Sequence, residues 1–291
     1  MGYLACVIRA LLIAVVGSLL VACPRAPLPS ELPVPPAKVA KFGDGVPLVT
    51  PGERMTYRVE LRGVELAVMT IGVGDLTDLD GVKTIVVQVH AKSVGLAQML
   101  AAVDDTFTSW IDVTTGRSRR FAVDEFETNS KINVEHSVAD LARRSDDQVP
   151  ITFALNDGAP LPESQKVTLP DVWDYCSFLV ALRSWEGPSG TKQKIEVLRS
   201  RFLWAMEIGI KGKEKLTTEL GELPALRFDA HTFKLTRAGA KDMTSDERDM
   251  SIWVSDDNDR VPLKLTARTD YGDIKMDIVD YQPGTGQRLR K

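Results

Sequence analysis

The alternation of apolar and polar residues constrains the fold of this 291-residue chain more than any other feature. Met55, Tyr57, Val59 and Leu61 are separated by single polar residues, the period of a β-strand with one buried face. Apolar-rich segments of strand type recur at 64–73, 84–90, 105–113, 119–127, 194–198, 202–210, 227–236, 250–255, 261–269 and 272–279. Turn residues between several of them, such as Asp80-Gly81, favour hairpins. The pattern predicts a mainly antiparallel β fold.

Two internal segments have the composition of helices. Residues 93–103 (SVGLAQMLAAV) are apolar and rich in alanine, and residues 171–185 follow Pro170 with an acidic residue at their start. We therefore expect a curved antiparallel sheet, a roll or half-barrel, with one or two helices packed on it or inside it. One β-rich domain over residues 54–282, followed by a flexible tail at 283–291, is the preferred division. The alternative places a domain boundary within residues 137–170.

The N-terminal segment is typical of an export signal. Residues 10–22 form an apolar run of 13 residues behind Arg9. Such a run is shorter than the ~20 residues that a membrane span needs. Its end, Leu20-Val21-Ala22-Cys23, resembles the bacterial lipobox, which predicts cleavage between Ala22 and Cys23 and a lipid on Cys23. A plain signal peptide and an uncleaved membrane helix from about Leu4 are the alternatives.

The segment after Cys23 is rich in proline, and we expect residues 23–53 to be a tether. Prolines stand at positions 24, 27, 29, 33, 35 and 36. This density favours an extended polyproline II spacer. We expect a protein lipid-anchored in the outer membrane and facing the periplasm, because no acidic retention residue follows Cys23. Pro24 leaves sorting to the inner membrane open.

Charge and cysteine content limit the kinds of binding partner and the disulfides that this chain can have. Removal of residues 1–22 takes away one basic residue, Arg9, and leaves 35 basic against 40 acidic residues, a net charge of −5. A mildly acidic chain argues against a nucleic-acid partner. With Cys6 in the signal and Cys23 lipidated, Cys176 has no partner for a disulfide. We expect Cys176 to be buried and inert.

The polar run Asp256-Asp257-Asn258-Asp259-Arg260 is the strongest candidate contact site, with Asp256, Asp257 and Arg260 as ligand contacts. Oxygen ligands in such a run could hold calcium, but the glycine and distal glutamate of an EF-hand loop are missing. A solvated turn is the favoured interpretation. The three histidines have no metal-ligand spacing, so no metal, cofactor or catalytic residue is assigned.

Several segments together resemble a known family. They are Gly52-Glu53-Arg54-Met55-Thr56-Tyr57, residues 104–112 (DDTFTSWID) before Thr115-Gly116, residues 171–183, and Trp253-Val254-Ser255-Asp256-Asp257 with Arg260-Val261-Pro262-Leu263. In order and spacing they resemble the bacterial family catalogued as domain of unknown function 3108. The resemblance implies an exported, often lipid-anchored, β-rich protein without an assigned activity.

Three hypotheses for function follow. The first is a non-catalytic envelope protein that binds an apolar ligand, a glycan or a protein partner. The second is a hydrolase of envelope polysaccharide or peptidoglycan that uses carboxylates such as Asp104, Asp105, Asp256 and Asp257 as acid and base. The third is an assembly factor without a small ligand.

Overall fold

A computed structural model describes residues 41–128, 130–245, 247–269 and 272–290. The signal segment, with Ala22 and Cys23, lies outside these residues. No helix in the described part of the chain is long and apolar enough to span a bilayer.

The chain forms one open, curved sheet of fifteen strands, as the alternation predicts. The strands are β1 (Arg54–Leu61), β2 (Val64–Leu79), β3 (Val82–Ser93), β4 (Asp104–Asp112), β5 (Ser118–Phe126), β6 (Val134–Ala139), β7 (Gln148–Leu155), β8 (Leu161–Lys166), β9 (Val172–Asp174), β10 (Lys192–Arg199), β11 (Phe202–Thr218), β12 (Gly221–Lys234), β13 (Arg248–Ser255), β14 (Pro262–Thr269) and β15 (Gly272–Gln282). β1 lies at the centre of the sheet and pairs with β2 on one side and β15 on the other. On the first side the strands follow in sequence order from β2 to the edge strand β8, and on the second side in reverse order from β15 to the edge strand β9. Every pairing is antiparallel except β9 with β10.

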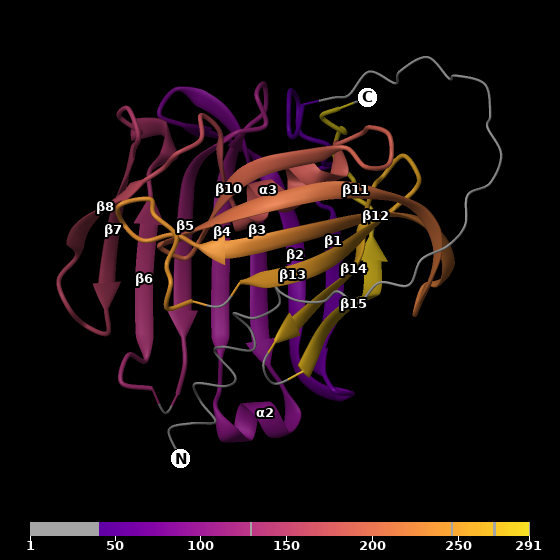
Figure 1. Cartoon of the computed structure of the whole chain (residues 1–291), viewed down its shortest axis with the longest axis horizontal. Helices are drawn as coiled ribbons and strands as arrows, with labels where there is room; N and C mark the ends of the chain where they lie inside the picture. The colour runs from indigo at the N-terminus through magenta and orange to yellow at the C-terminus, as the bar shows by residue number, and fades with distance from the viewer. Residues whose placement is uncertain (1–40, 129, 246, 270–271, 291) are drawn as a thin grey trace.

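The sheet folds back over a helix. β10–β13 cross in front of β1–β4, and α3 (Tyr175–Arg183) lies between the two parts (Figure 1). The Asp174 side chain accepts a hydrogen bond from the Ser177 amide at 2.8 Å and caps the helix. All residues of α3 from Cys176 to Arg183 are buried. The predicted helix inside a curved sheet is confirmed.

Aromatic side chains fill the space between the two parts of the sheet. The Phe42 ring lies 5.3 Å from Trp173, 5.9 Å from Phe178 and 5.4 Å from Trp185, centroid to centroid. Two cavities in this interior measure about 10 and 30 Å³. A cavity of 30 Å³ has room for about one water molecule.

The edge strand β8 is joined to the β10–β11 turn and to the segment after β12 by individual hydrogen bonds rather than by a strand ladder. Glu163 on β8 accepts hydrogen bonds from Arg237 at 2.6 Å and from Arg201 at 3.4 Å. Gln165 Nε2 donates to the Thr236 carbonyl at 2.9 Å, and the Lys166 amide donates to the Arg237 carbonyl at 3.0 Å. These contacts cover the outer edge of β8, which would otherwise expose unpaired backbone groups.

Both ends of the expected domain need correction. Phe42 and Val49, placed in the tether from sequence, are buried in the core, because their apolar side chains pack against the α3 layer. Residues 283–290, predicted as a flexible tail, pack beside them: the Leu289 amide donates to the Val49 carbonyl at 3.1 Å, and the Gly286 amide to the Pro51 carbonyl at 3.0 Å. The packed region therefore extends at both ends beyond 54–282.

Both predicted helices are shorter than their composition indicated. In place of a helix over 93–103, α2 covers only Gly95–Leu100; Ser93 belongs to β3, and Val103 forms an isolated bridge with Glu127. Residues 172–174 form β9, and α3 begins only at Tyr175.

The strands at 134–166 were not predicted, because they carry many charged and exposed residues, which obscured their alternation.

Candidate functional site

The outward face of β10–β15 carries a hollow of about 710 Å³, here called the outer groove. Its volume lies within the ~300–1,000 Å³ of typical ligand sites. The polar and aromatic side chains that line it include Ser189, Lys192, Glu207, Lys211, Arg227, Asp229, His231, Asp249, Ser251, Trp253, Thr266, Arg268, Asp273 and Lys275.

Strand alternation places these side chains on the outer face. On β12, Leu226, Phe228 and Ala230 are buried in the core, so Arg227, Asp229 and His231 point outward. β13 follows the same rule. Register then sets the outward residues opposite one another: Arg227 faces Trp253, Asp229 faces Ser251, and His231 faces Asp249. The groove is therefore lined by rows that cross several strands.

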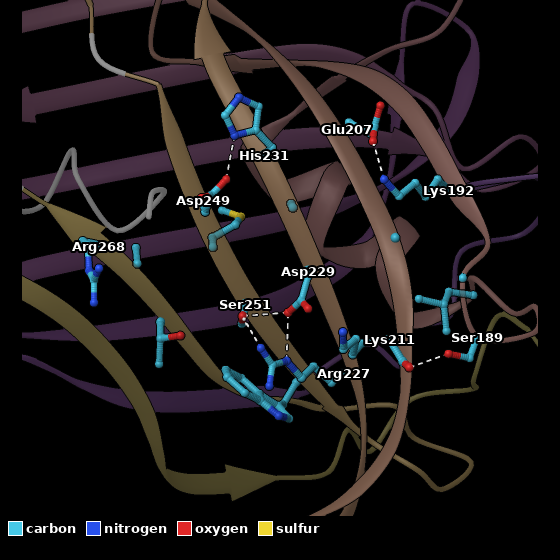
Figure 2. A pocket seen from close by; sticks show the side chains of 18 of the residues that line it. Ser189, Lys192, Glu207, Lys211, Arg227, Asp229, His231, Asp249, Ser251 and Arg268 are labelled. Atoms are coloured by element: carbon cyan, nitrogen blue, oxygen red, sulfur yellow. Dashed lines mark hydrogen bonds and ion pairs between the residues drawn. The ribbon is translucent and has the colours of Figure 1, made fainter. Parts of the chain in front are cut away.

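The central row is a closed hydrogen-bond network. Arg227 donates to Asp229 Oδ1 at 2.8 Å and to Ser251 Oγ at 3.1 Å. Ser251 Oγ donates to the same Asp229 oxygen at 2.8 Å, so the three side chains form a triangle (Figure 2). The Arg227 guanidinium also lies 5.1 Å from the Trp253 ring, within cation–π range. These contacts fix the polar groups in place.

A second row holds His231 between two carboxylates. Its ring nitrogens lie 2.6 Å from Asp249 and 2.7 Å from Glu247. Burial lowers the pKa of His231, but hydrogen bonds to Asp249 and Glu247 outweigh it, and the net pKa is raised. Nearby, the hydrogen bond from Lys192 at 2.8 Å lowers the pKa of Glu207 (Figure 2). The raised pKa of His231 favours its protonated form between the two carboxylates at mildly acidic pH.

Small residues form the floor of the outer groove. Gly209 on β11 lies opposite Lys192 and Asp229, and Thr266 on β14 lies opposite Ser251. A Cβ atom added at Gly209 would come within 3.1 Å of Lys192 Cγ. Because Gly209 has no side chain, the outer groove is deeper at this position.

The residues predicted from sequence gather in a different place. Asp256, Asp257 and Arg260 line a hollow of about 590 Å³ at the β13–β14 loop, here called the loop cleft, together with Arg288. Asp257 Oδ1 accepts hydrogen bonds from Ser255 Oγ at 2.7 Å and from the amides of Asp259 and Arg260 at 2.9 Å each. Its carboxylate thus stabilises the turn.

The other two residues of this set are also engaged. Asp256 pairs with Lys213 at 2.7 Å, and Arg260 with Glu186 at 3.0 Å. The structure brings the three predicted contacts together, but with their charges directed at neighbouring elements. The loop cleft is therefore a weaker candidate than the outer groove.

Asp104 and Asp105, the other carboxylates of the hydrolase hypothesis, lie in neither hollow. Burial raises the pKa of Asp104, but hydrogen bonds from Lys92 and His90 outweigh it, and the net pKa is lowered. Asp105 is buried, and its carboxylate accepts the Phe126 amide at 3.1 Å. A glycosidase needs two carboxyls that flank one cleft. Asp104 and Asp105 share no hollow with Asp256 and Asp257, whose carboxylates are engaged by Lys213 and by the β13–β14 turn.

Cys176 is buried, as the sequence predicts, and two histidines contact aspartates on neighbouring strands. Cys176 is fully buried, and burial raises the pKa of its thiol well above the usual value. Within the described residues, no group of three or more His, Cys, Asp or Glu side chains is placed to hold a metal ion. His90 on β3 and His136 on β6 each lie 2.6 Å from an aspartate on the next strand.

A family model described as protein of unknown function, DUF3108, matches residues 55–279. The chain belongs to the DUF3108 family. The match confirms the resemblance inferred from sequence and covers every residue that lines the outer groove. No curated protein sequence matches this DUF3108 chain.

Three solved structures align with this DUF3108 protein. A β-barrel-like protein of the DUF1849 family from Brucella abortus aligns with a TM-score of 0.52 and 10% identity, over 82% of this chain and 99% of that one. A candidate lipoprotein from Parabacteroides distasonis aligns at 0.35 and 8%, over 83% and 100%. A candidate exported protein with a YmcC-like fold from Bacteroides fragilis aligns at 0.32 and 6%, over 82% and 99%. The Brucella structure shares the overall fold.

Proposed function

We propose that this DUF3108 protein is a lipid-anchored envelope module that binds a hydroxyl-rich ligand, an envelope glycan, in the outer groove without catalysing a reaction. The observation that carries this proposal is the contrast between a filled interior and a hollow outer face. Two cavities in the described interior measure about 10 and 30 Å³, against about 710 Å³ for the outer groove. An apolar ligand held inside the sheet is disfavoured for the same reason.

The lining of the outer groove supports a hydroxyl-rich ligand. Arg227 and the lysines donate hydrogen bonds, Asp229 and Asp249 accept them, and the Ser251 and Thr266 hydroxyls do both. A sugar hydroxyl is both donor and acceptor, so it can bind across such a mixed row. The triangle of Arg227, Asp229 and Ser251 holds these groups in position before a ligand arrives.

The lipid anchor rests on the sequence around Cys23. Seventeen residues separate Cys23 from Lys41, where the described chain begins with an ion pair from Lys41 to Asp171 at 2.7 Å. We place the anchor in the outer membrane with the folded domain in the periplasm. The proposed division of the chain is a signal at 1–22, a tether from Cys23 up to the packed residues, and the β-rich domain.

The anchor is tested by expressing the full chain and a Cys23→Ser variant in a Gram-negative host with an alkyne-tagged fatty acid. The account predicts label on the wild-type chain, no label on the variant, and accumulation of an uncleaved form when lipoprotein signal peptidase is inhibited. Fatty-acid label on both chains or on neither would contradict the anchor.

Glycan binding is tested by co-sedimentation of the purified mature chain with isolated peptidoglycan and lipopolysaccharide. Thr266→Trp places a bulky side chain on the groove floor, and Thr70→Trp places the same side chain on the outer face of β2, away from the groove. We expect retention of wild type and Thr70→Trp, and loss of Thr266→Trp. Equal retention of all three would place any binding elsewhere, and no retention of wild type would remove the proposal.

A further inference from the structure

The connection from β3 to β4 exposes apolar side chains to solvent. Leu96, Met99 and Leu100 of α2 are 69%, 81% and 52% exposed; these three residues are here called the apolar tip. α2 projects beyond the ends of β3 and β4 at the lower end of the molecule (Figure 1). β2, which contacts α2, adds Val64, which is 52% exposed. Clustered apolar residues of this kind mark interaction sites.

The apolar tip carries no charge that would oppose entry into lipid. The eleven residues from Ser93 to Val103 include no acidic or basic side chain. The charges that flank this segment are paired: Asp104 lies 2.9 Å from Lys92 and 2.6 Å from His90. Transfer of this connection to an apolar medium therefore leaves no lone charge to desolvate.

The backbone around the apolar tip is also hydrogen-bonded within the protein. The Val94 amide donates to the Leu66 carbonyl at 3.0 Å, and the Ala101 amide to the Ala97 carbonyl at 2.9 Å. The Ala102 amide donates to Thr128 Oγ1 at 2.8 Å. Ala97 and Ala101 are buried and hold the helix against the sheet. Internal bonding of this kind is what lipid requires of a backbone.

The tether is long enough to bring the apolar tip to the bilayer that holds the lipid on Cys23. The described chain begins near the far end of β4, because Asp44 pairs with Arg117, which follows β4, at 3.2 Å. β4 spans nine residues, about 30 Å at 3.3 Å per residue. The 18 residue-to-residue steps from Cys23 to Lys41 would reach about 56 Å in the polyproline II spacer that the sequence predicts.

We infer that the apolar tip is a lipid-binding surface that inserts among the headgroups of the bilayer in which the Cys23 lipid is anchored. This inference uses the lipid anchor of the proposed function to identify the bilayer, and it is independent of glycan binding. The contact rests on apolar side chains and the mature chain carries a net charge of −5. Binding therefore depends little on anionic lipid or on salt.

The test uses the mature full chain with Cys23→Ser, so that no attached lipid contributes. An environment-sensitive fluorophore is attached through Met99→Cys, or through Asp124→Cys as the matched exposed control on β5; Cys176 is buried and does not react. The probes are vesicles of phosphatidylcholine with phosphatidylethanolamine, and the same with phosphatidylglycerol. We expect a blue shift at position 99 with both compositions and none at position 124.

A second variant separates the apolar tip from the rest of the surface. Leu96→Ser with Met99→Ser changes two exposed side chains, and its partition into the same vesicles should fall at least tenfold while its thermal unfolding stays unchanged. No blue shift at position 99 at millimolar lipid, or equal partition of the double variant, would overturn the inference and leave a protein partner as the occupant. The fatty-acid labelling of Cys23 is a separate readout, so failure of the anchor and failure of the apolar tip are distinguishable.

Discussion

Glu53 and Arg183 form a two-pronged ion pair in the core, with N–O distances of 2.7 and 2.8 Å and side chains 2% and 4% exposed. The pair joins the residue before β1 to the last residue of α3. Arg183 also donates to the Asp259 carbonyl at 2.7 Å, and the Tyr281 hydroxyl donates to Glu53 at 3.1 Å. One buried charge pair therefore connects four separate parts of the chain.

Loss of one partner of this pair should be strongly destabilising. Glu53→Gln or Arg183→Met leaves the other charge buried without its counterion, which typically costs about 3–5 kcal/mol. The double variant should lose less than the sum of the two single variants. Urea unfolding of the three variants measures these differences in the free energy of unfolding. A loss below about 1 kcal/mol for both single variants would contradict the role assigned to the pair.

Asp174 should make the stability of the wild-type chain depend on pH in an unusual direction. Burial raises the pKa of Asp174, although hydrogen bonds from Ser177 and Ser109 oppose the shift. From the unfolded value of about 3.9 up to the raised folded value, the folded state binds more protons at this site, so stability falls as pH rises. Asp174→Asn cannot ionise but keeps a residue that can cap α3.

Comparison of wild type with Asp174→Asn isolates the contribution of Asp174 ionisation to stability. The free energy of unfolding of Asp174→Asn, relative to wild type, should grow as pH is raised from about 4 toward neutrality. Urea unfolding at several pH values gives this difference. A difference that stays constant with pH, or that moves the other way, would show that Asp174 is ionised in the folded protein without penalty.

Thr232 offers a test of the filled interior. Its side chain is fully buried at the cavity of about 30 Å³, and its hydroxyl has no hydrogen-bond partner in the described part of the chain. Replacement of a buried, unsatisfied hydroxyl by a methyl group of similar shape should raise the free energy of unfolding by about 1 kcal/mol. We therefore expect Thr232→Val to melt at a higher temperature. A loss of stability would instead indicate that the hydroxyl binds a water molecule in the cavity.

The fold could be predicted from sequence because its signal is local. The alternation of Met55, Tyr57, Val59 and Leu61 records one buried face, and β1 has that pattern. The strands β6–β8 were not predicted from sequence, because they mix charged, exposed residues with few buried ones. Asp171 was taken as the start of a helix, whereas Asp174 is the residue that caps α3, since residues 172–174 pair with β10.

The outer groove could not be predicted because it depends on register between strands that are distant in sequence. Arg227, Asp229 and His231 alternate on β12, which was a visible sign of an exposed polar face. Their partners Trp253, Ser251 and Asp249 come from β13, and only the pairing of the two strands sets them opposite. The Asp256–Arg260 run was conspicuous in sequence because charges cluster in turns, and a turn is what it forms.

Carboxyl footprinting tests most directly whether a glycan occupies the outer groove. The mature chain is labelled by carbodiimide coupling of an amine, with and without solubilised peptidoglycan fragments or lipopolysaccharide glycan, and modified residues are quantified by mass spectrometry. The account predicts protection of Glu207, Asp249 and Asp273 in the groove, and unchanged labelling of Asp124 on β5 and of Asp257 in the loop cleft. Unchanged labelling of the groove carboxyls at saturating glycan, or protection confined to Asp257, would contradict it.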